Sequence, residues 1–245
     1  ATKAIDRPNR SKQKVQIRRA DNRGHAMHWR LDTWHTFSFS DYFDPAQMGF
    51  RSLRVMNEDW IKGGQGFGKH PHRDMEIVTY ILEGELEHRD SLGNGSVLRS
   101  GEFQRMTAGT GITHSEFNPS PAATTHLYQI WLMPRQKGLT PSYDQRVFAA
   151  EEKRGRFRLV ASPDGAGDSL TIQQDARIYL ADFAPGAELR HEVAPGRHAW
   201  VQVLRGSARL GKETLQAGDG VAISEETTIA LQGEDEGEVM LFDLA

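Results

Sequence analysis

"YILEGELEHRDSLGNGSVLRSGEFQRM" (residues 80–106) has a counterpart later in the chain, "VQVLRGSARLGKETLQAGDGVAI" (residues 201–223). Each stretch runs from an apolar strand through a charged residue and a glycine into a second strand and a turn. Each then reaches a third strand through a glycine followed by an acidic residue. The glycines at equivalent places are similarly separated: Gly84 and Gly206 by 122 residues, Gly101 and Gly218 by 117. Because 122 is about half of the 245 residues, we predict two similar units in tandem.

Other short runs also have the composition of β-strands, such as "EIVTYILEG" (76–84), "HLYQIWLMP" (126–134) and "VMLFDL" (239–244). Gly, Asn, Pro and Asp separate these runs, and no long helical periodicity is present. "DSLGNGS" (90–96) predicts a hairpin, with Asn94-Gly95 supplying the positive φ angles of its turn. The pattern predicts an all-β sandwich or barrel.

The boundary between the two units is expected in "MPRQKGLTPSYDQRVF" (133–148), where the composition becomes polar and rich in proline. We therefore predict a flexible N-terminal tail over residues 1–14, one domain over residues 15–138 and a second over residues 139–245.

The composition excludes several classes of function. A net charge of −3, with both signs interspersed, gives no basic surface for nucleic acid. The absence of cysteine excludes disulfides, thiolate ligands and cysteine nucleophiles, so any metal must be held by nitrogen and oxygen. No apolar run is long enough to span a membrane, and "ATKAIDRPNRSKQKVQ" (1–16) lacks the apolar core of a signal peptide. A cytoplasmic protein is expected by default.

Two pairs of residues have the spacing of metal ligands on β-strands. His70 and His72 in "HPH", and His114 and Glu116 in "HSE", are each separated by one residue. Residues i and i+2 of a strand point to the same face about 6.5–7 Å apart, so each pair can converge on one ion. Three imidazoles and one carboxylate suit a single divalent transition metal ion: Fe(II), Ni, Mn, Co, Cu or Zn.

Glu76 is a competing carboxylate, four residues after His72. Along a straight strand these two residues would be about 13 Å apart, so Glu76 could reach the ion only if the chain turned between them. Glu116 needs no turn. We therefore predict His70, His72, His114 and Glu116 as the ligands, with Glu76 behind them or in strand packing.

The two motifs also resemble those of cupins: "G-x5-HxH-x3-E-x7-G" runs from Gly64 to Gly84, and "G-x4-H-x3-N" ends at Asn118. The wider text is very similar to the pirin family of bicupins, as seen in "DTWHTFSFSDYFDP" (32–45), "GFGKHPHRDMEIVTYILEGELEHRDS" (66–91) and "MTAGTGITHSEFNPS" (106–120). The resemblance implies two tandem cupin domains (double-stranded β-helix, or jelly-roll), with one metal in the N-terminal domain. It also implies that the carboxylate ligand is the glutamate two residues after the third histidine, which is Glu116.

The C-terminal half departs from the cupin pattern, because His191 and His198 are seven residues apart and no histidine follows "AGDGVAI". We predict that this domain lacks a metal site. Among the other histidines, His35 is expected to be a hydrogen-bonded core residue and His126 a packing residue. His88, between charged neighbours, is expected to face solvent.

Bacterial pirins resemble quercetin 2,3-dioxygenases, so the first functional hypothesis is an oxidoreductase that opens a flavonol ring with O₂ and releases CO. Glu116 would be both ligand and catalytic base. The aromatic residues are expected to be mostly core, but a few of them could line an apolar substrate pocket: Phe50, Phe67, Phe103, Phe117 and Trp131. Dioxygenase chemistry on another natural substrate is a variant of this hypothesis. The alternative is a non-enzymatic, redox-sensing module that binds a protein partner, as animal pirins are nuclear iron-binding cofactors. Fe(II) is favoured by the resemblance alone, and a monomer is expected.

Overall fold

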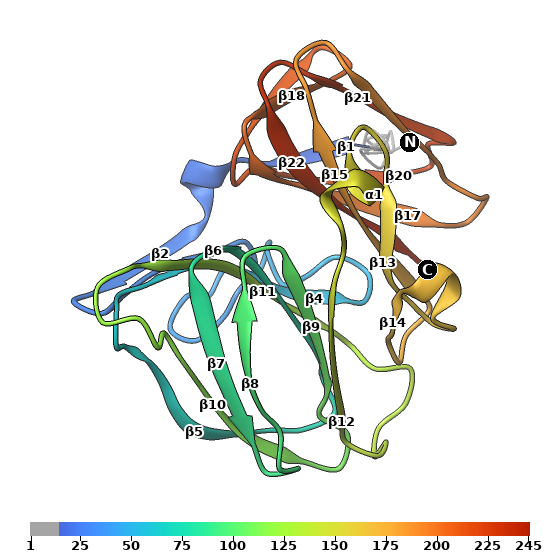
Figure 1. The fold of residues 1–245 in the computed structure, drawn as a ribbon. Coiled ribbons are helices and arrows are strands. Elements are labelled where there is room, and N and C mark those ends of the chain that lie inside the picture. The colour runs from blue at the N-terminus through green and yellow to red at the C-terminus, as the bar shows by residue number, and fades with distance from the viewer. Residues whose placement is uncertain (1–14) are drawn as a thin grey trace, which may run out of the picture.

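A computed structural model describes residues 15–245, and the predicted tail over residues 1–14 lies outside this range. The described chain is nearly all β and forms two cupin domains, each a sandwich of one seven-stranded and one four-stranded sheet (Figure 1). The predicted fold class is therefore confirmed. No helix among the described residues is long and apolar enough to cross a membrane.

In the N-terminal domain, the seven-stranded sheet consists, in spatial order, of β12 (Ser142–Val147), β9 (Glu102–Thr107), β6 (Glu76–Glu83), β11 (Thr125–Leu132), β4 (Leu53–Ile61), β3 (Leu31–His35) and β2 (Gly24–His28). The four-stranded sheet consists of β5 (Gly66–His72), β10 (Ile112–Phe117), β7 (Glu85–Asp90) and β8 (Gly95–Arg99).

In the C-terminal domain, the seven-stranded sheet consists of β1 (Val15–Arg18), β20 (Gly220–Ser224), β17 (His198–Arg205), β22 (Gly237–Leu244), β15 (Ala176–Phe183), β13 (Arg158–Ser162) and β14 (Leu170–Thr171). The four-stranded sheet consists of β16 (Glu188–Glu192), β21 (Thr228–Gly233), β18 (Ser207–Leu210) and β19 (Glu213–Gln216). Three short helical turns complete the described chain: η1 (Ala20–Asn22), α1 (Ala150–Lys153) and η2 (Ala166–Asp168).

The internal repeat places its glycines at equivalent corners of the two domains. Gly84 joins β6 of the large sheet to β7 of the small sheet, and Gly206 joins β17 to β18 in the same way. Both glycines have a positive φ, 82° and 69° respectively, which residues with a side chain rarely adopt. The predicted internal repeat therefore corresponds to the same order of strands in both domains and to the same glycine turn between the large and the small sheet.

Gly206→Ala is expected to destabilise the protein, because its Cβ would lie 2.2 Å from the main-chain oxygen of Glu236. Backbone strain alone lowers the free energy of unfolding by about 1–3 kcal/mol, and the clash adds to this. Thermal unfolding of the variant checks the prediction. Gly211→Ala is the matched control, since Gly211 also has a positive φ but no atom near the added Cβ. Equal melting temperatures for the two variants would contradict the role of the close contact.

The hairpin predicted at residues 90–96 is present, but its turn differs from the prediction. Gly93, with a φ of 89°, supplies the left-handed residue, whereas neither Asn94 nor Gly95 has a positive φ. The Asp90 carboxylate accepts hydrogen bonds from the main-chain N–H groups of Leu92 and Asn94 at 2.9 and 3.1 Å. The Asp90 carboxylate thus stabilises a turn whose left-handed residue, Gly93, precedes the predicted Asn94-Gly95 pair by one residue.

The predicted division between residues 138 and 139 does not follow the sheets, because each domain contributes an edge strand to the other half. β1 pairs with β20 of the C-terminal domain, although it comes first in the chain. β12, which follows the predicted boundary, pairs with β9 of the N-terminal domain. Figure 1 shows β1, in blue, beside the orange and red strands. The polar, proline-rich stretch at residues 133–148 connects the two domains, but it also contains β12, which belongs to the N-terminal sheet.

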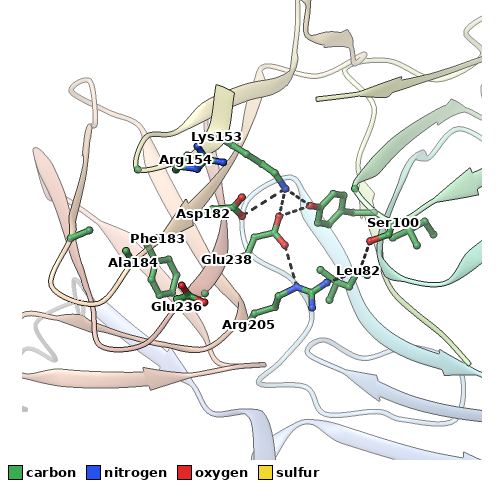
Figure 2. Close-up of a pocket in the computed structure, with 16 residues that line it drawn as sticks. Leu82, Ser100, Lys153, Arg154, Asp182, Phe183, Ala184, Arg205, Glu236 and Glu238 are labelled. Atoms are coloured by element: carbon green, nitrogen blue, oxygen red, sulfur yellow. Dashed lines mark hydrogen bonds and ion pairs between the residues drawn. The ribbon is translucent and has the colours of Figure 1, made fainter. Parts of the chain in front are cut away.

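The two domains share one hydrophobic core, which includes Tyr80 and Tyr128 from the first domain and Trp200 and Phe242 from the second. A buried ionic network adjoins it. Lys153 Nζ donates to Glu238 Oε2 at 2.8 Å and to the Tyr80 hydroxyl at 2.9 Å. Arg205 donates to the main-chain oxygen of Leu82 at 2.5 Å and approaches Glu238 at 3.5 Å (Figure 2). These contacts join β6 of one domain to β17 and β22 of the other.

Candidate metal centre

The small sheet of the N-terminal domain brings the four predicted ligands to one face. β5 and β10 are antiparallel neighbours, and His70 lies opposite His114 in their register. In β10 alternate residues are buried, so His114 and Glu116 both point into the sandwich. The two-residue spacing in each strand therefore has the structural effect that the sequence predicted.

Three imidazole nitrogens converge at this face. His114 Nε2 lies 2.8 Å from His70 Nε2 and 2.8 Å from His72 Nε2. The Glu116 Oε1 atom lies 3.5 Å from the same His114 nitrogen. A ring nitrogen has either one proton or one lone pair, so the His114 nitrogen cannot satisfy both neighbours by hydrogen bonding. A cation bound by all three lone pairs does satisfy them, and the three histidines form a metal site.

Burial keeps His114 and His72 in the form that binds metal. It lowers the pKa of His114 to about 2, with His72 and His70 adding to the shift. It also lowers the pKa of His72 to about 4, and His70 contributes. Neutral imidazoles with free lone pairs are the ligand form, so no proton has to be displaced at neutral pH.

Glu116 is 2% exposed, and burial raises its pKa to about 7, with the nearby Asp59 contributing. Gln129 Nε2 donates to Glu116 Oε1 at 3.3 Å, and Trp131 Nε1 donates to the oxygen of Gln129 at 3.3 Å. A bound cation would favour the ionised carboxylate at this position. The donor set is thus suited to a divalent ion held by nitrogen and oxygen.

His88 is placed differently from the prediction. It was expected to face solvent, but it is fully buried and hydrogen bonded to Asp90 Oδ2 at 2.7 Å. The period of two in β7 puts it on the same face as the buried Leu86. "HRD" (88–90) also has the spacing of "HPH" and "HSE", and this was the signal that could have identified it.

The predictions for two other histidines are confirmed. His35 is 5% exposed and hydrogen bonded to the Thr33 hydroxyl at 3.0 Å. His126 stacks on Trp60 with ring centroids 4.3 Å apart, and its Nε2 is 2.7 Å from Glu58. Both are packed, polar residues of the interior.

Glu76 lies away from the three histidines. It is fully buried and accepts hydrogen bonds from the Thr107 hydroxyl at 3.0 Å and from the main-chain N–H of Gln173 at 3.1 Å. Gln173 belongs to the C-terminal domain, so Glu76 contributes to the contact between the domains. Its burial raises its pKa.

The equivalent sheet of the C-terminal domain has apolar side chains where ligands would stand. Leu189 of β16, and Ile229 and Leu231 of β21, belong to a hydrophobic core cluster. His191 instead contacts Asp243 at 2.9 Å, and His198 contacts the Ser224 hydroxyl at 2.8 Å. The C-terminal domain therefore repeats the strands of the metal centre but has apolar side chains on them.

One cavity is lined by a histidine of the centre, and a second lies at Asp59 and Phe67. The first, of about 370 Å³, is lined by His72, Arg73 and the chain at residues 111–113. The other, of about 410 Å³, extends from the β2–β3 hairpin to Asp59 and Phe67, which lies opposite Glu116 in the strand register. Trp131 stands edge-on to His72, with ring centroids 5.2 Å apart. The metal centre is thus accessible beside His72 and bordered by aromatic rings.

Comparisons with known proteins agree with this architecture. The family model described as Pirin matches residues 16–132, and the model described as Quercetinase C-terminal cupin domain matches residues 159–244. The quercetin 2,3-dioxygenase of Escherichia coli is 48% identical over 230 residues, covering 94% of this chain and 98% of the relative. The pirin-like protein of Caulobacter vibrioides is 37% identical over 92% of this chain and 97% of its own.

Solved structures give the same relationship. The crystal structure of the bacterial pirin YhhW from Escherichia coli in complex with nickel(II) superposes with a TM-score of 0.90. It is 49% identical and covers 94% of this chain and 98% of its own. With two cupin domains, a histidine metal site in the first of them and relatives of this similarity, the chain belongs to the pirin family.

Proposed function

We propose that this protein is a metal-dependent quercetin 2,3-dioxygenase, which consumes a flavonol and O₂, opens the central ring and releases CO. The observation that supports this most directly is the convergence of His70, His72 and His114 beside the buried Glu116. The similarity to a quercetin 2,3-dioxygenase extends over 94% of the chain and so includes both domains.

We further propose Glu116 as the fourth ligand, and Fe(II) as the native ion. Three neutral imidazoles and a carboxylate accept several divalent ions, nickel(II) being the one in the structure of the Escherichia coli relative. The bound ion would polarise the flavonol oxygen that contacts it and lower the pKa of that hydroxyl.

In this proposal Glu116 takes the hydroxyl proton of the flavonol at its carboxylate. A bound cation would favour the ionised form of this carboxylate, which is the form that accepts a proton. Gln129 holds Oε1 by a hydrogen bond and so limits rotation of the carboxylate. Phe67 and Trp131 offer flat apolar surfaces to the substrate rings and exclude water from the centre.

Quercetin turnover tests the proposal. Protein loaded separately with Fe(II), Ni, Mn, Co, Cu or Zn is mixed with quercetin in the presence of O₂, and flavonol absorbance and CO release are followed. We expect at least one metal to give turnover, and we expect His70→Ala to reduce that rate by more than about 100-fold because a direct ligand is lost.

The matched control is His198→Ala, which removes a histidine bound to Ser224 in the other domain and should leave the rate unchanged. Rates equal to the buffer blank with every metal would contradict the proposed activity. Turnover by His70→Ala at the rate of the unmodified protein would contradict the proposed site.

A further inference from the structure

A third pair of residues with two-residue spacing faces the metal centre. β7 is the neighbour of β10 on the side away from β5. In this register Glu116 lies opposite His88, and His114 lies opposite Asp90. Directly opposed residues of antiparallel strands point to the same face with Cβ atoms about 4.5–5.5 Å apart. "HRD" therefore extends the face formed by "HPH" and "HSE" onto a third strand.

Asp90 fixes the orientation and the tautomer of His88. Its side chain and that of His88 are both fully buried and meet at 2.7 Å. The Asp90 oxygens also accept hydrogen bonds from Leu92 and Asn94, so Asp90 acts as an acceptor. His88 Nε2 must then carry the proton of this contact, which leaves the lone pair on Nδ1.

The Nδ1 atom of His88 is buried and has no hydrogen-bond partner among the described residues. Tyr143 stacks on the ring with centroids 4.6 Å apart, and its hydroxyl is held by Ser96 at 2.8 Å. The ring is therefore fixed on one face by stacking and at one edge by Asp90. A ring nitrogen of His88 lies within 4.8 Å of a ligand atom of His114 and one of Glu116.

We propose that His88, oriented by Asp90, is a positioning residue that holds the Glu116 carboxylate in the metal centre through a water molecule bound to Nδ1. One water can donate a hydrogen bond to this lone pair and another to a carboxylate oxygen. Gln129 restrains Glu116 from the large sheet, and His88 does so from the small sheet.

If His88 only filled space in the core, there would be no reason for a polar ring with a buried, unpartnered Nδ1 at this position. A buried acceptor without a partner lowers the free energy of unfolding by about 1–3 kcal/mol, and an apolar ring would fill the same space without that penalty. Metal-binding sites commonly include carboxylate and histidine partners behind the ligands, and loss of one weakens metal binding by about 10–100-fold. The inference rests on the metal centre and Glu116 as its ligand, and it does not require flavonol turnover.

Binding of Co(II) to His88→Leu tests the inference. The dissociation constant is measured by calorimetry, and the visible absorption of the Co(II)-loaded protein reports the arrangement of its ligands. We expect binding weaker by about 10–100-fold and an altered visible spectrum. Asp90→Asn should change both in the same direction by a smaller amount, and it serves if His88→Leu does not fold.

His126→Leu is the matched control, because His126 also contacts a carboxylate at 2.7 Å and stacks on an aromatic ring. It should bind Co(II) with unchanged affinity and an unchanged spectrum. Equal weakening in His88→Leu and His126→Leu would overturn the inference, since general loosening would then be the cause. Unchanged affinity and spectrum in His88→Leu would overturn it as well. Because no flavonol is present, the outcome is independent of the proposed enzyme activity.

Discussion

Replacing His114 with alanine is expected to abolish tight metal binding while the metal-free protein remains folded. His114 Nε2 is the nitrogen that contacts both other imidazoles, so its removal takes away the centre of the ligand set. We expect metal affinity to fall by more than about 100-fold, beyond the loss seen for residues behind a ligand. Elemental analysis after dialysis and calorimetric titration with Ni(II) measure this.

Thermal unfolding gives an independent readout of the same change. An ion present at a thousand times its dissociation constant stabilises the folded protein by about 4 kcal/mol, which raises the melting temperature by roughly 8–16 °C for a chain of this size. His114→Ala should lose this metal-dependent rise. His191→Ala, which removes a histidine bound to Asp243, should keep it. A full metal-dependent rise in His114→Ala would show that the ion binds elsewhere.

Lys153→Met is expected to give the largest loss of stability. The Lys153 side chain is 10% exposed and the Glu238 side chain 5% exposed, so the ammonium balances a buried carboxylate. Removing one partner of a buried ion pair lowers the free energy of unfolding by about 3–5 kcal/mol, and here the buried Glu238 would keep only the 40% exposed Arg205, 3.5 Å away, as a cationic partner. Chemical denaturation of the metal-free protein measures the change.

Two further variants separate the buried charge from general damage. The double variant Lys153→Met, Glu238→Leu should recover part of the stability, since no carboxylate then stays buried there and the 40% exposed Arg205 keeps its pair with Glu83. Arg158→Met breaks the pair between Arg158 and Glu152, whose side chain is 44% exposed, and should change stability by no more than about 1 kcal/mol. A loss in Lys153→Met as small as that in Arg158→Met would contradict the importance of this network.

The sequence predicts the cluster of His70, His72 and His114 because the information needed is local. Two-residue spacing places two side chains on one face of a strand, whatever the strand pairs with. It does not give the register of β5 with β10, and this register is what brings His70 to His114. The prediction for His88 is wrong because the charged neighbours Glu87 and Arg89 suggest an exposed strand, whereas the period of two places His88 on the buried face with Leu86.

The strand exchange could not be predicted in the same way. The repeat gives the order of strands within each half, but an edge strand carries no signal for which sheet it joins. β1 and β12 occupy equivalent edges of the two large sheets, each beside the strand that follows the second glycine of the repeat. Tertiary packing alone determines that β1 joins the sheet of the C-terminal domain and β12 the sheet of the N-terminal domain.

This exchange makes the two domains depend on each other for folding. If the C-terminal domain opens, β1 loses its partner β20, and if the N-terminal domain opens, β12 loses its partner β9. Opening of either domain therefore leaves a strand without its partner, β1 in one case and β12 in the other, and unpaired strands promote aggregation. Because the domains are joined in this way, we expect an ion bound at His70, His72 and His114 to stabilise the C-terminal domain as well, although it does not contact that domain.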